Sequence, residues 1–395
     1  MLRKNRLFTP GPTPLLPAAQ TDMAAANVHH RTADFRLLYT RVLADLKTFV
    51  GSQNDVVLMS SSGSGAMEAA VANLTSPGDR VLVLTAGKFG ERWVELAKAY
   101  NLAADVLSAP YGQTFAMDEV RARLSPDTRA VYMQATESST GVRHDVQGVS
   151  ELLREAGGDT LLAVDAITGL GTTRFDVDGW NIDVIIGGSQ KAVIVPPGLA
   201  YCAVSPRAWK RMETTKSPRY YFDLRKERKA GAKGESAFTP AIALVAALAA
   251  ALDYIREQGS GDLAAGREAL IANAELCAEM TRAGAHALVL KLYASVPSNA
   301  LTAVAAPEGL DSAVIVKAFR DNFGAVVAAG QGEMKSALFR IAHLGYYDYL
   351  DTVGIVAALE QVMARLRPVE FGSAVAAAQK VYAERGAHKL ASARH

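Results

Sequence analysis

Short apolar runs alternate with segments of helical periodicity between about residues 55 and 205. Several of the apolar runs have no polar face, which is typical of strands in a sheet covered on both sides. The predicted strands are Val56–Ser60, Arg80–Leu84, Ala104–Ser108, Ala130–Gln134, Thr160–Val164, Val184–Gly187 and Ala200–Val204. The helical segments between them are Gly65–Leu74, Gly90–Tyr100, Met117–Leu124 and Val146–Ala156. This alternation predicts a mainly parallel α/β sheet, whose ligands bind beyond the carboxyl ends of the strands.

The pattern breaks at residues 206–236, and a second α/β unit follows. The break is basic and contains glycine, which favours a solvated surface loop and leaves open a basic lid near an anionic ligand. Thr239 and Pro240 predict the start of an Ala-rich helix at 241–255, because threonine suits the N-cap and proline the first helical position. Beyond it, the pattern predicts helices near Asp262–Ala283, Asp311–Phe323 and Asp348–Leu366, and strands at Leu288–Tyr293, Leu301–Ala305, Ala325–Ala329 and Leu338–His343.

The composition of the 395 residues excludes several classes of protein. Hydrophobic residues make up 50% and charged residues 21%, which is unlike a disordered chain, and the net charge of +2 gives no bulk attraction to nucleic acid or anionic membrane. The two cysteines, Cys202 and Cys277, lack the spacing of a zinc site and suit a reducing compartment. The apolar run Ala241–Leu252 is shorter than the roughly 20 residues of a membrane span, and no secretory signal is evident. We therefore expect a cytoplasmic protein without a bound metal.

A segment rich in serine and glycine, Ser60–Glu68, follows one predicted strand and opens a helix. The free N–H groups of a helix start form an anion site, serine hydroxyls add donors, and glycine permits close backbone approach. The segment lacks the Gly-Lys-Ser/Thr of a Walker loop and the third glycine of the dinucleotide fingerprint. From these residues alone, a phosphate cradle and a plain helix cap both stay open.

Three charged side chains lie at or inside predicted strands. Asp165 follows Thr160–Val164, where an acid is costly unless it joins an ion pair or keeps a ligand's ring nitrogen protonated. Lys191 follows Val184–Gly187 and precedes an apolar stretch; it is either a solvated loop lysine or a buried amine with a lowered pKa. Arg340 lies in an apolar strand and needs a carboxylate, either internal or on a ligand. A phosphate cradle, a ring-nitrogen acid, a nucleophilic amine and a carboxylate-binding arginine together are what pyridoxal phosphate (PLP) chemistry on amino acids requires.

These motifs, in their order along the chain, resemble those of the class V aminotransferases of fold type I. They are most similar to the alanine/serine–glyoxylate (serine–pyruvate) group. The strongest match is Val164–Ala166 followed by Gly188–Ala192, which places Lys191 26 positions after Asp165. The other matching segments are Thr9–Pro14, His29–Phe35, Ser62–Ala70, Gly87–Trp93, Glu137–Val142 and Arg340–Ile341. The resemblance covers residues 7 to about 366.

The resemblance implies a role for each site residue. Lys191 would be the Schiff-base lysine, Asp165 the partner of the pyridinium nitrogen, and Arg340 the group that holds the substrate carboxylate. The other implied cofactor contacts are Ser62, Gly63, Ser64 and Gln190 at the phosphate, Phe89 on the ring, Ser138 near the ring hydroxyl or substrate, and Thr239 at the phosphate of the neighbouring subunit. Three of these residues also suit a purely structural role: Phe89 as a core aromatic, Ser138 as a turn residue and Thr239 as the helix N-cap.

The resemblance also implies the fold, the assembly and the reaction. We expect a fold type I PLP-dependent transferase with an N-terminal arm at 1–20 packing with the small domain, a large, mainly parallel seven-stranded sheet domain at 21–257, and a smaller C-terminal α/β domain at 258–395. Such folds usually place the site at a homodimer interface. At Gly234–Ser236 the chain lacks the aromatic residue that some relatives have near the phosphate. The implied reaction moves an amino group from serine, alanine or aspartate to glyoxylate or pyruvate.

Three alternative functions compete with this one. A cysteine desulfurase needs a mobile cysteine near the C-terminal part of the site, but Cys202 has a strand pattern, Cys277 a helical one, and no cysteine follows. A nicotinamide oxidoreductase built on the Gly63/Gly65 turn would leave Lys191 and Arg340 without a role. A catalytically silent relative that serves as a subunit of another complex stays open.

Overall fold

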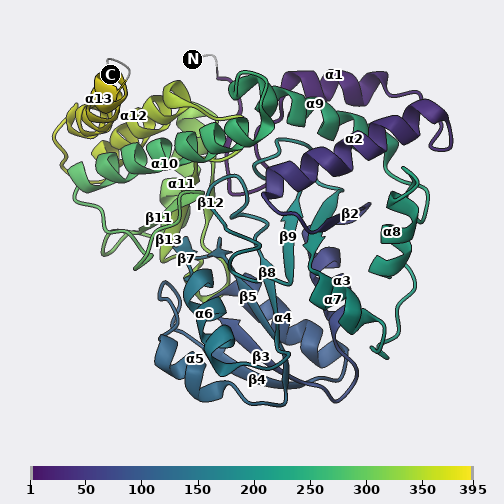
Figure 1. Cartoon of the computed structure of the whole chain (residues 1–395). Coiled ribbons are helices and arrows are strands. Elements are labelled where there is room, and N and C mark those ends of the chain that lie inside the picture. The colour runs from purple at the N-terminus through teal and green to yellow at the C-terminus, as the bar shows by residue number, and fades with distance from the viewer. Residues whose placement is uncertain (1–2, 393–395) are drawn as a thin grey trace.

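The large sheet occupies the centre of one half of the molecule. The computed structural model describes residues 3–392 (Figure 1). Seven strands pair in the order β2-β10-β9-β8-β5-β3-β4. Their bounds are β2 (Asp55–Met59), β3 (Arg80–Thr85), β4 (Ala103–Ser108), β5 (Thr128–Gln134), β8 (Leu161–Asp165), β9 (Val184–Gly188) and β10 (Ala200–Val204). Among these strands β10 alone runs against the others, so the predicted mainly parallel seven-stranded sheet is confirmed.

Helices cover both faces of this sheet, because its strands are apolar on both sides. In β3, Leu82 and Leu84 join one apolar cluster, while the alternate residues Val81 and Val83 join the other. The first cluster is covered by α2 (Ala33–Val50), α5 (Met117–Arg123), α6 (Val146–Ala156) and α9 (Ile242–Gln258). The second is covered by α3 (Gly63–Leu74), α4 (Lys88–Ala99) and α7 (Pro206–Met212).

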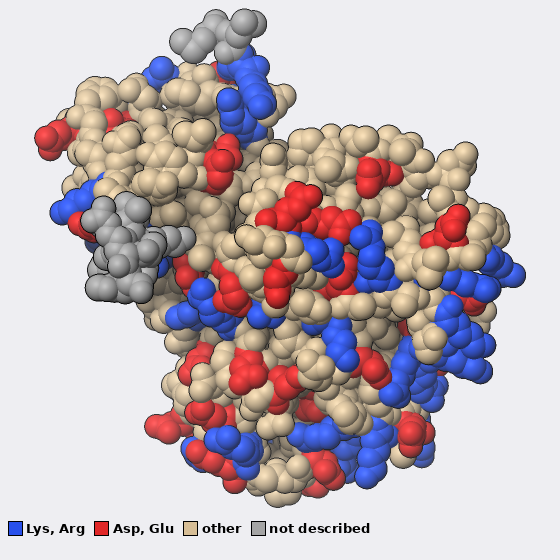
Figure 2. Space-filling view, turned by 45° about the horizontal axis from the view of Figure 1, so that its top comes forward, with Lys and Arg blue, Asp and Glu red and all other residues tan. Residues whose placement is uncertain are grey.

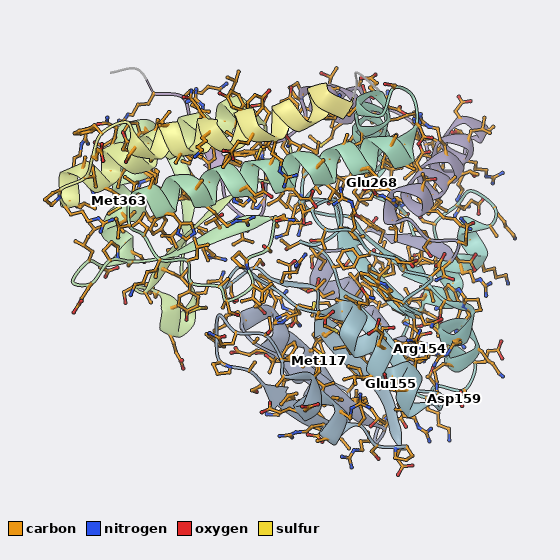
Figure 3. The ribbon with its side chains drawn as sticks, turned by 60° about the vertical axis from the view of Figure 1, so that its left-hand side comes forward. Met117, Arg154, Glu155, Asp159, Glu268 and Met363 are labelled. Carbon is orange, nitrogen blue, oxygen red and sulfur yellow. The ribbon has the colours of Figure 1, made fainter. Side chains whose placement is uncertain are left out.

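A smaller α/β unit follows and has its own apolar core. Its sheet has the order β1-β12-β13-β11, in which β1 (Arg6–Phe8) runs parallel to β12, so the start of the chain joins the C-terminal sheet. The other elements are α10 (Leu263–Ala287), β11 (Leu301–Ala305), α11 (Ser312–Phe323), β12 (Ala325–Ala329), β13 (Leu338–Ala342), α12 (Tyr349–Leu366) and α13 (Ser373–Ser392). Figures 1 and 3 show α10, which carries Glu268, running alongside α13. Because α10 packs on α9 as well as on α12 and α13, the boundaries at 20/21 and 257/258 stay predictions.

The segment at 206–236 is not the continuous loop that the sequence predicted. It contains α7 and α8 (Leu224–Gly231), each started by a side-chain cap. Ser205 accepts from the N–H of Ala208, and Asp223 from that of Arg225. Figure 2 shows Lys and Arg side chains gathered at its right-hand edge, the side on which α7 and α8 lie in Figure 1, so the basic face is solvated as expected.

One predicted strand of the small unit is absent. Leu288–Tyr293 forms no regular strand among the described residues and has one isolated bridge, between Leu292 and Val304. The reason is Val289, whose φ of 56° interrupts an extended backbone directly after α10. The prediction of a strand here is therefore wrong.

The predicted start of α9 is also wrong. The helix begins at Ile242 with Ala241 at its N-cap, and not at Thr239 and Pro240. The N–H of Ala241 donates to the Ser60 hydroxyl at 2.9 Å, a tertiary contact that fixes the entry to the helix and that local sequence does not display.

The helices are those of a packed globular unit. Among the described residues, none of them combines the length and the apolar character needed to cross a bilayer.

Candidate active site

Asp165 lies where three parallel strands end together. It closes β8, and in the register of the sheet it stands between Gln134 of β5 and Ile186 of β9. Its side chain is buried and accepts from the N–H of Ile167 at 2.9 Å. Burial raises the pKa of Asp165 to about 6, although the Ile167 hydrogen bond and the Lys191 charge oppose the shift. Among the described residues, no side chain forms a salt bridge with it, so this acid is available to a ligand.

Lys191 lies three residues beyond β9 and is buried beside Asp165. Burial lowers the pKa of Lys191 to about 8; the Asp165 charge opposes this shift and the Arg340 charge adds to it. The Nζ atom donates to the carbonyl of Pro10. A substantial fraction of this amine is therefore neutral near pH 7.5, as a nucleophile requires.

The N-terminal segment covers Lys191, a contact that the sequence did not predict. The Thr13 hydroxyl donates a hydrogen bond to the Lys191 carbonyl at 3.2 Å, and the Pro10 carbonyl accepts one from the Lys191 amine. Gly11 has a φ of 148°, and a Cβ placed on it would stand 2.7 Å from the Lys191 Nζ atom. Glycine is required here because both the backbone conformation and the amine exclude a side chain. The conspicuous Thr9–Pro14 motif was the available sign of this contact.

Replacing Gly11 with alanine is expected to lower activity by about 10- to 100-fold, because the new methyl group displaces the Lys191 amine. Steady-state kinetics measure the loss. Gly78, whose Cβ would meet nothing within 4 Å and whose φ is also positive, supplies the control variant Gly78→Ala. Equal activity of the two variants would contradict this role for the N-terminal segment.

Arg340 lies on β13 of the small unit, and its side chain contacts the segment that follows β5 of the large sheet. Its side chain is buried; Nη1 donates to the Ser138 carbonyl at 2.7 Å and Nη2 to the Ala329 carbonyl at 2.6 Å. The buried Nε atom has no partner among the described residues. Burial lowers the pKa of Arg340 to about 10, and the Glu137 charge opposes the shift. Arg340 therefore stays a cation. Within the described residues it forms no internal salt bridge: two of its nitrogens bind carbonyls, and its Nε donor has no partner.

The start of α3 supplies neutral donors beside β8. Ser62 is its N-cap, and its hydroxyl caps no backbone group of the helix. A Cβ on Gly63 would stand 2.2 Å from the Cδ1 atom of Ile167, so a larger residue here would displace the Ile167 side chain. The Oε1 atom of Gln190 is buried and unpartnered among the described residues. The helix start and the free Ser62 hydroxyl can donate to an anionic group, whereas this Gln190 oxygen is an acceptor and cannot.

Glu137 ties the segments that carry Phe89 and Ser138, and the sequence pattern gave it no role. It is fully buried and accepts from the N–H groups of Phe89 at 3.1 Å and Gly90 at 3.0 Å, at the start of α4. It also accepts from the Ser139 hydroxyl at 2.6 Å. Burial raises the pKa of Glu137. This carboxylate therefore fixes the half-buried Phe89 ring relative to the buried Ser138.

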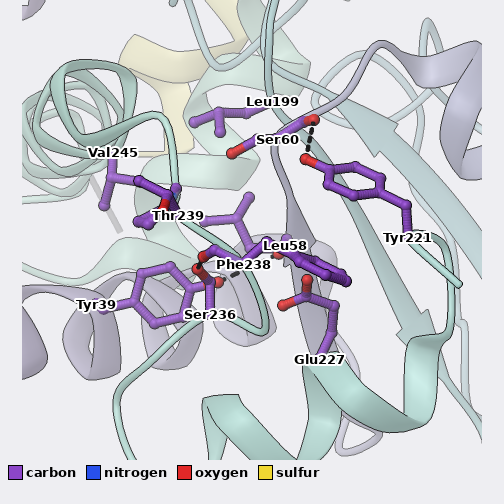
Figure 4. A pocket seen from close by; sticks show the side chains of 11 residues that line it. Tyr39, Leu58, Ser60, Leu199, Tyr221, Glu227, Ser236, Phe238, Thr239 and Val245 are labelled. Carbon is purple, nitrogen blue, oxygen red and sulfur yellow. Dashed lines mark hydrogen bonds between the residues drawn. The ribbon is translucent and has the colours of Figure 1, made fainter. Parts of the chain in front are cut away.

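Thr239 does not lie with Asp165, Lys191 and Arg340. It lies in a small pocket lined also by Tyr39, Ser60 and Ser236 (Figure 4), and neither Asp165, Lys191 nor Arg340 lines that pocket. Thr239 is also not the N-cap of α9. Its contact with the cofactor of a neighbouring subunit stays a prediction. Within residues 3–392, no cluster of His, Cys, Asp and Glu side chains could hold a metal ion.

Comparison with known proteins identifies the family. The model of the class V aminotransferases matches residues 18–335. The chain belongs to the class V aminotransferase family. This confirms the family that the motifs resemble. It also confirms the prediction that the protein is a PLP-dependent aminotransferase.

Proteins and structures similar to this chain span nearly its whole length. The small subunit of a soluble hydrogenase from Synechococcus sp. is 39% identical over 96% of this chain and 99% of that protein. L-aspartate–glyoxylate aminotransferase of Paracoccus denitrificans is 33% identical over 97% of both chains. The crystal structure of a subgroup IV aspartate aminotransferase from Thermus thermophilus superimposes with a TM-score of 0.85 at 33% identity, covering 92% of this chain and 100% of that one. The predicted fold type I is thus confirmed.

The residues fit PLP, the cofactor of this family. The start of α3 and the free Ser62 hydroxyl suit its phosphate, and Asp165 suits its ring nitrogen. The buried amine of Lys191 suits its aldehyde.

Proposed function

We propose that this protein is a PLP-dependent transaminase that moves an amino group from a small amino acid (serine, alanine or aspartate) to glyoxylate or pyruvate. The observation that carries the proposal is the buried amine of Lys191. It lies within the electrostatic reach of one acid, Asp165, and two cations, Arg340 and Arg92. None of these three forms a salt bridge within residues 3–392. The aspartate–glyoxylate enzyme among its relatives supports this choice of substrates.

Each residue has a distinct task in this reaction. PLP, when bound, supplies a ring that withdraws electrons from the α-carbon of the amino acid. Arg340 binds the α-carboxylate of each substrate and so fixes the α-carbon toward Lys191. Asp165, mostly ionised at pH 7, holds a proton on the ring nitrogen by ion pairing. Lys191 would take the proton from the α-carbon, as a base, and deliver it to the C4′ carbon of the bound cofactor, as an acid.

The lowered pKa of Lys191 predicts how the capture of PLP by the cofactor-free protein depends on pH. The neutral amine is the reactive form, so the capture rate is expected to rise about tenfold per pH unit below pH 8 and to level off above it. Rapid-mixing absorbance measures this profile. Because the Asp165 charge raises the Lys191 pKa, the variant Asp165→Asn is expected to shift the midpoint to lower pH. A rate that keeps rising to pH 10 would indicate a solvated lysine instead.

The colour of the purified protein tests the proposal. We expect a yellow protein whose visible absorbance falls when an amino donor is added and returns with a 2-oxo acid. A panel of serine, alanine and aspartate against glyoxylate, pyruvate and 2-oxoglutarate identifies the substrates. A protein that takes up no PLP, or that keeps its colour with every donor, would refute the transaminase.

A second candidate function, a catalytically silent subunit of another complex, is favoured by the similarity to a hydrogenase subunit. Against it, Lys191, Asp165 and Arg340 are all present, and among the described residues none of the three is neutralised by a salt bridge. The colour test separates the two functions, because a silent subunit would show no donor-dependent change.

A desulfurase is disfavoured by the state of both cysteines. Cys202 and Cys277 are fully buried, and burial raises the pKa of each thiol to about 12. Neither is an accessible thiolate.

We further propose that the protein works as a homodimer, in which Thr239 of one subunit completes the phosphate site of the other. Sedimentation or light scattering of the purified protein tests the dimer. The cytoplasmic location stays a prediction.

A further inference from the structure

The predicted phosphate cradle lacks positive charge. Its members, Ser62, Gly63, Ser64 and Gln190, are all neutral. A phosphate monoester carries about −1.5 to −2 charges at pH 7, and a helix start supplies only about +0.5. The cradle is thus short of about one full positive charge, and a cation nearby would supply it.

Arg92 lies next to the cradle on α4. Its Nη1 atom donates to the Ser64 hydroxyl at 2.9 Å, and its guanidinium lies over the Phe89 ring at 5.1 Å from the centroid. Among the described residues, Arg92 forms no salt bridge, and its neighbour Glu91 is bound by Lys88 instead. A guanidinium has five N–H donors, and within residues 3–392 Arg92 donates one side-chain hydrogen bond, to Ser64.

The Arg92 charge also reaches the reacting groups. Burial is the main cause of the raised pKa of Asp165 and the lowered pKa of Lys191, and the Arg92 charge contributes a lowering to both. The side chain is itself half-buried, so water screens it only in part. Arg92 therefore lies close enough to both residues for its charge to act on them.

We propose that Arg92 binds the phosphate of PLP as the charged member of the cradle, next to Ser64. This inference rests on the proposed function. It names the Arg92 guanidinium as the group that neutralises the phosphate. Its planar fork suits two phosphate oxygens at once.

Two ligands that differ only in the phosphate test this assignment. The full-length protein, stripped of cofactor, is titrated with PLP and with pyridoxal, which has the same ring and aldehyde. We expect Arg92→Gln to weaken PLP binding about 10- to 100-fold and pyridoxal binding less than threefold. Arg92→Lys keeps a point charge and is expected to lose less PLP affinity.

Controls separate the phosphate contact from a structural role. Lys88→Gln removes another cation of α4, one paired with Glu91, and is expected to leave both affinities within threefold. Thermal unfolding shows whether each variant folds. If both Arg92 variants lose equal affinity for PLP and for pyridoxal, or lose none for either, the inference is overturned. The proposed transaminase function would still stand. Failure of the unaltered protein to bind both ligands would refute the proposed function itself.

Discussion

Lys191→Ala is expected to bind PLP and yet to lose turnover by at least about 10²–10⁴-fold, the usual contribution of one acid–base group. The phosphate cradle and Asp165 do not depend on the amine, so the cofactor stays bound without its covalent link. Proton transfer at the α-carbon then has no base. Cofactor content by absorbance and turnover with the best donor measure the two effects separately.

The control for this variant is a lysine outside the site. Lys98, in the last turn of α4, supplies Lys98→Ala, which is expected to behave like the unaltered protein. Near-normal transamination by Lys191→Ala would show that another residue moves the proton.

Arg340→Ala is expected to raise the KM of donor and acceptor alike by about 10- to 100-fold, because hydrogen bonds to a charged group are worth roughly 1.5–3 kcal/mol. Both substrates carry the carboxylate that Arg340 binds, and one site serves both. Measuring KM for each substrate in turn tests the shared role.

Arg340 also bonds the Ser138 and Ala329 carbonyls, so its loss can disturb the junction of the two units. Arg340→Lys keeps the charge but not the fork, and an intermediate KM is expected from it. A change in KM for only one of the two substrates would contradict a common carboxylate site.

The sequence predicted the large sheet well, because its information is local. Strands apolar on both faces, separated by helical periods, leave few arrangements other than a covered parallel sheet. Asp165 and Lys191 could be singled out because residues after such strands gather at one edge. The end of α10 shows the opposite case: Val289 is apolar and β-branched, yet its positive φ breaks the strand expected there.

The rest of the site depends on contacts that local sequence does not reveal. Gly11 contacts Lys191 across 180 positions of chain, and Glu137, in the short strand β6 (Thr136–Glu137), binds the start of α4. Arg92 lay inside a recognised motif, but its hydrogen bond to Ser64 exists only once α3 and α4 are packed. The N-cap role expected of Thr239 failed for the same reason, since a hydroxyl from the end of β2 fixes the entry to α9.

The covalent link between Lys191 and PLP is the central claim, and chemical trapping tests it directly. Sodium borohydride makes that link permanent, and peptide mass spectrometry then locates the added pyridoxyl group. We predict a single modified peptide, with the group on Lys191. A modification on a different lysine, or none after incubation with PLP, would contradict this account of the site.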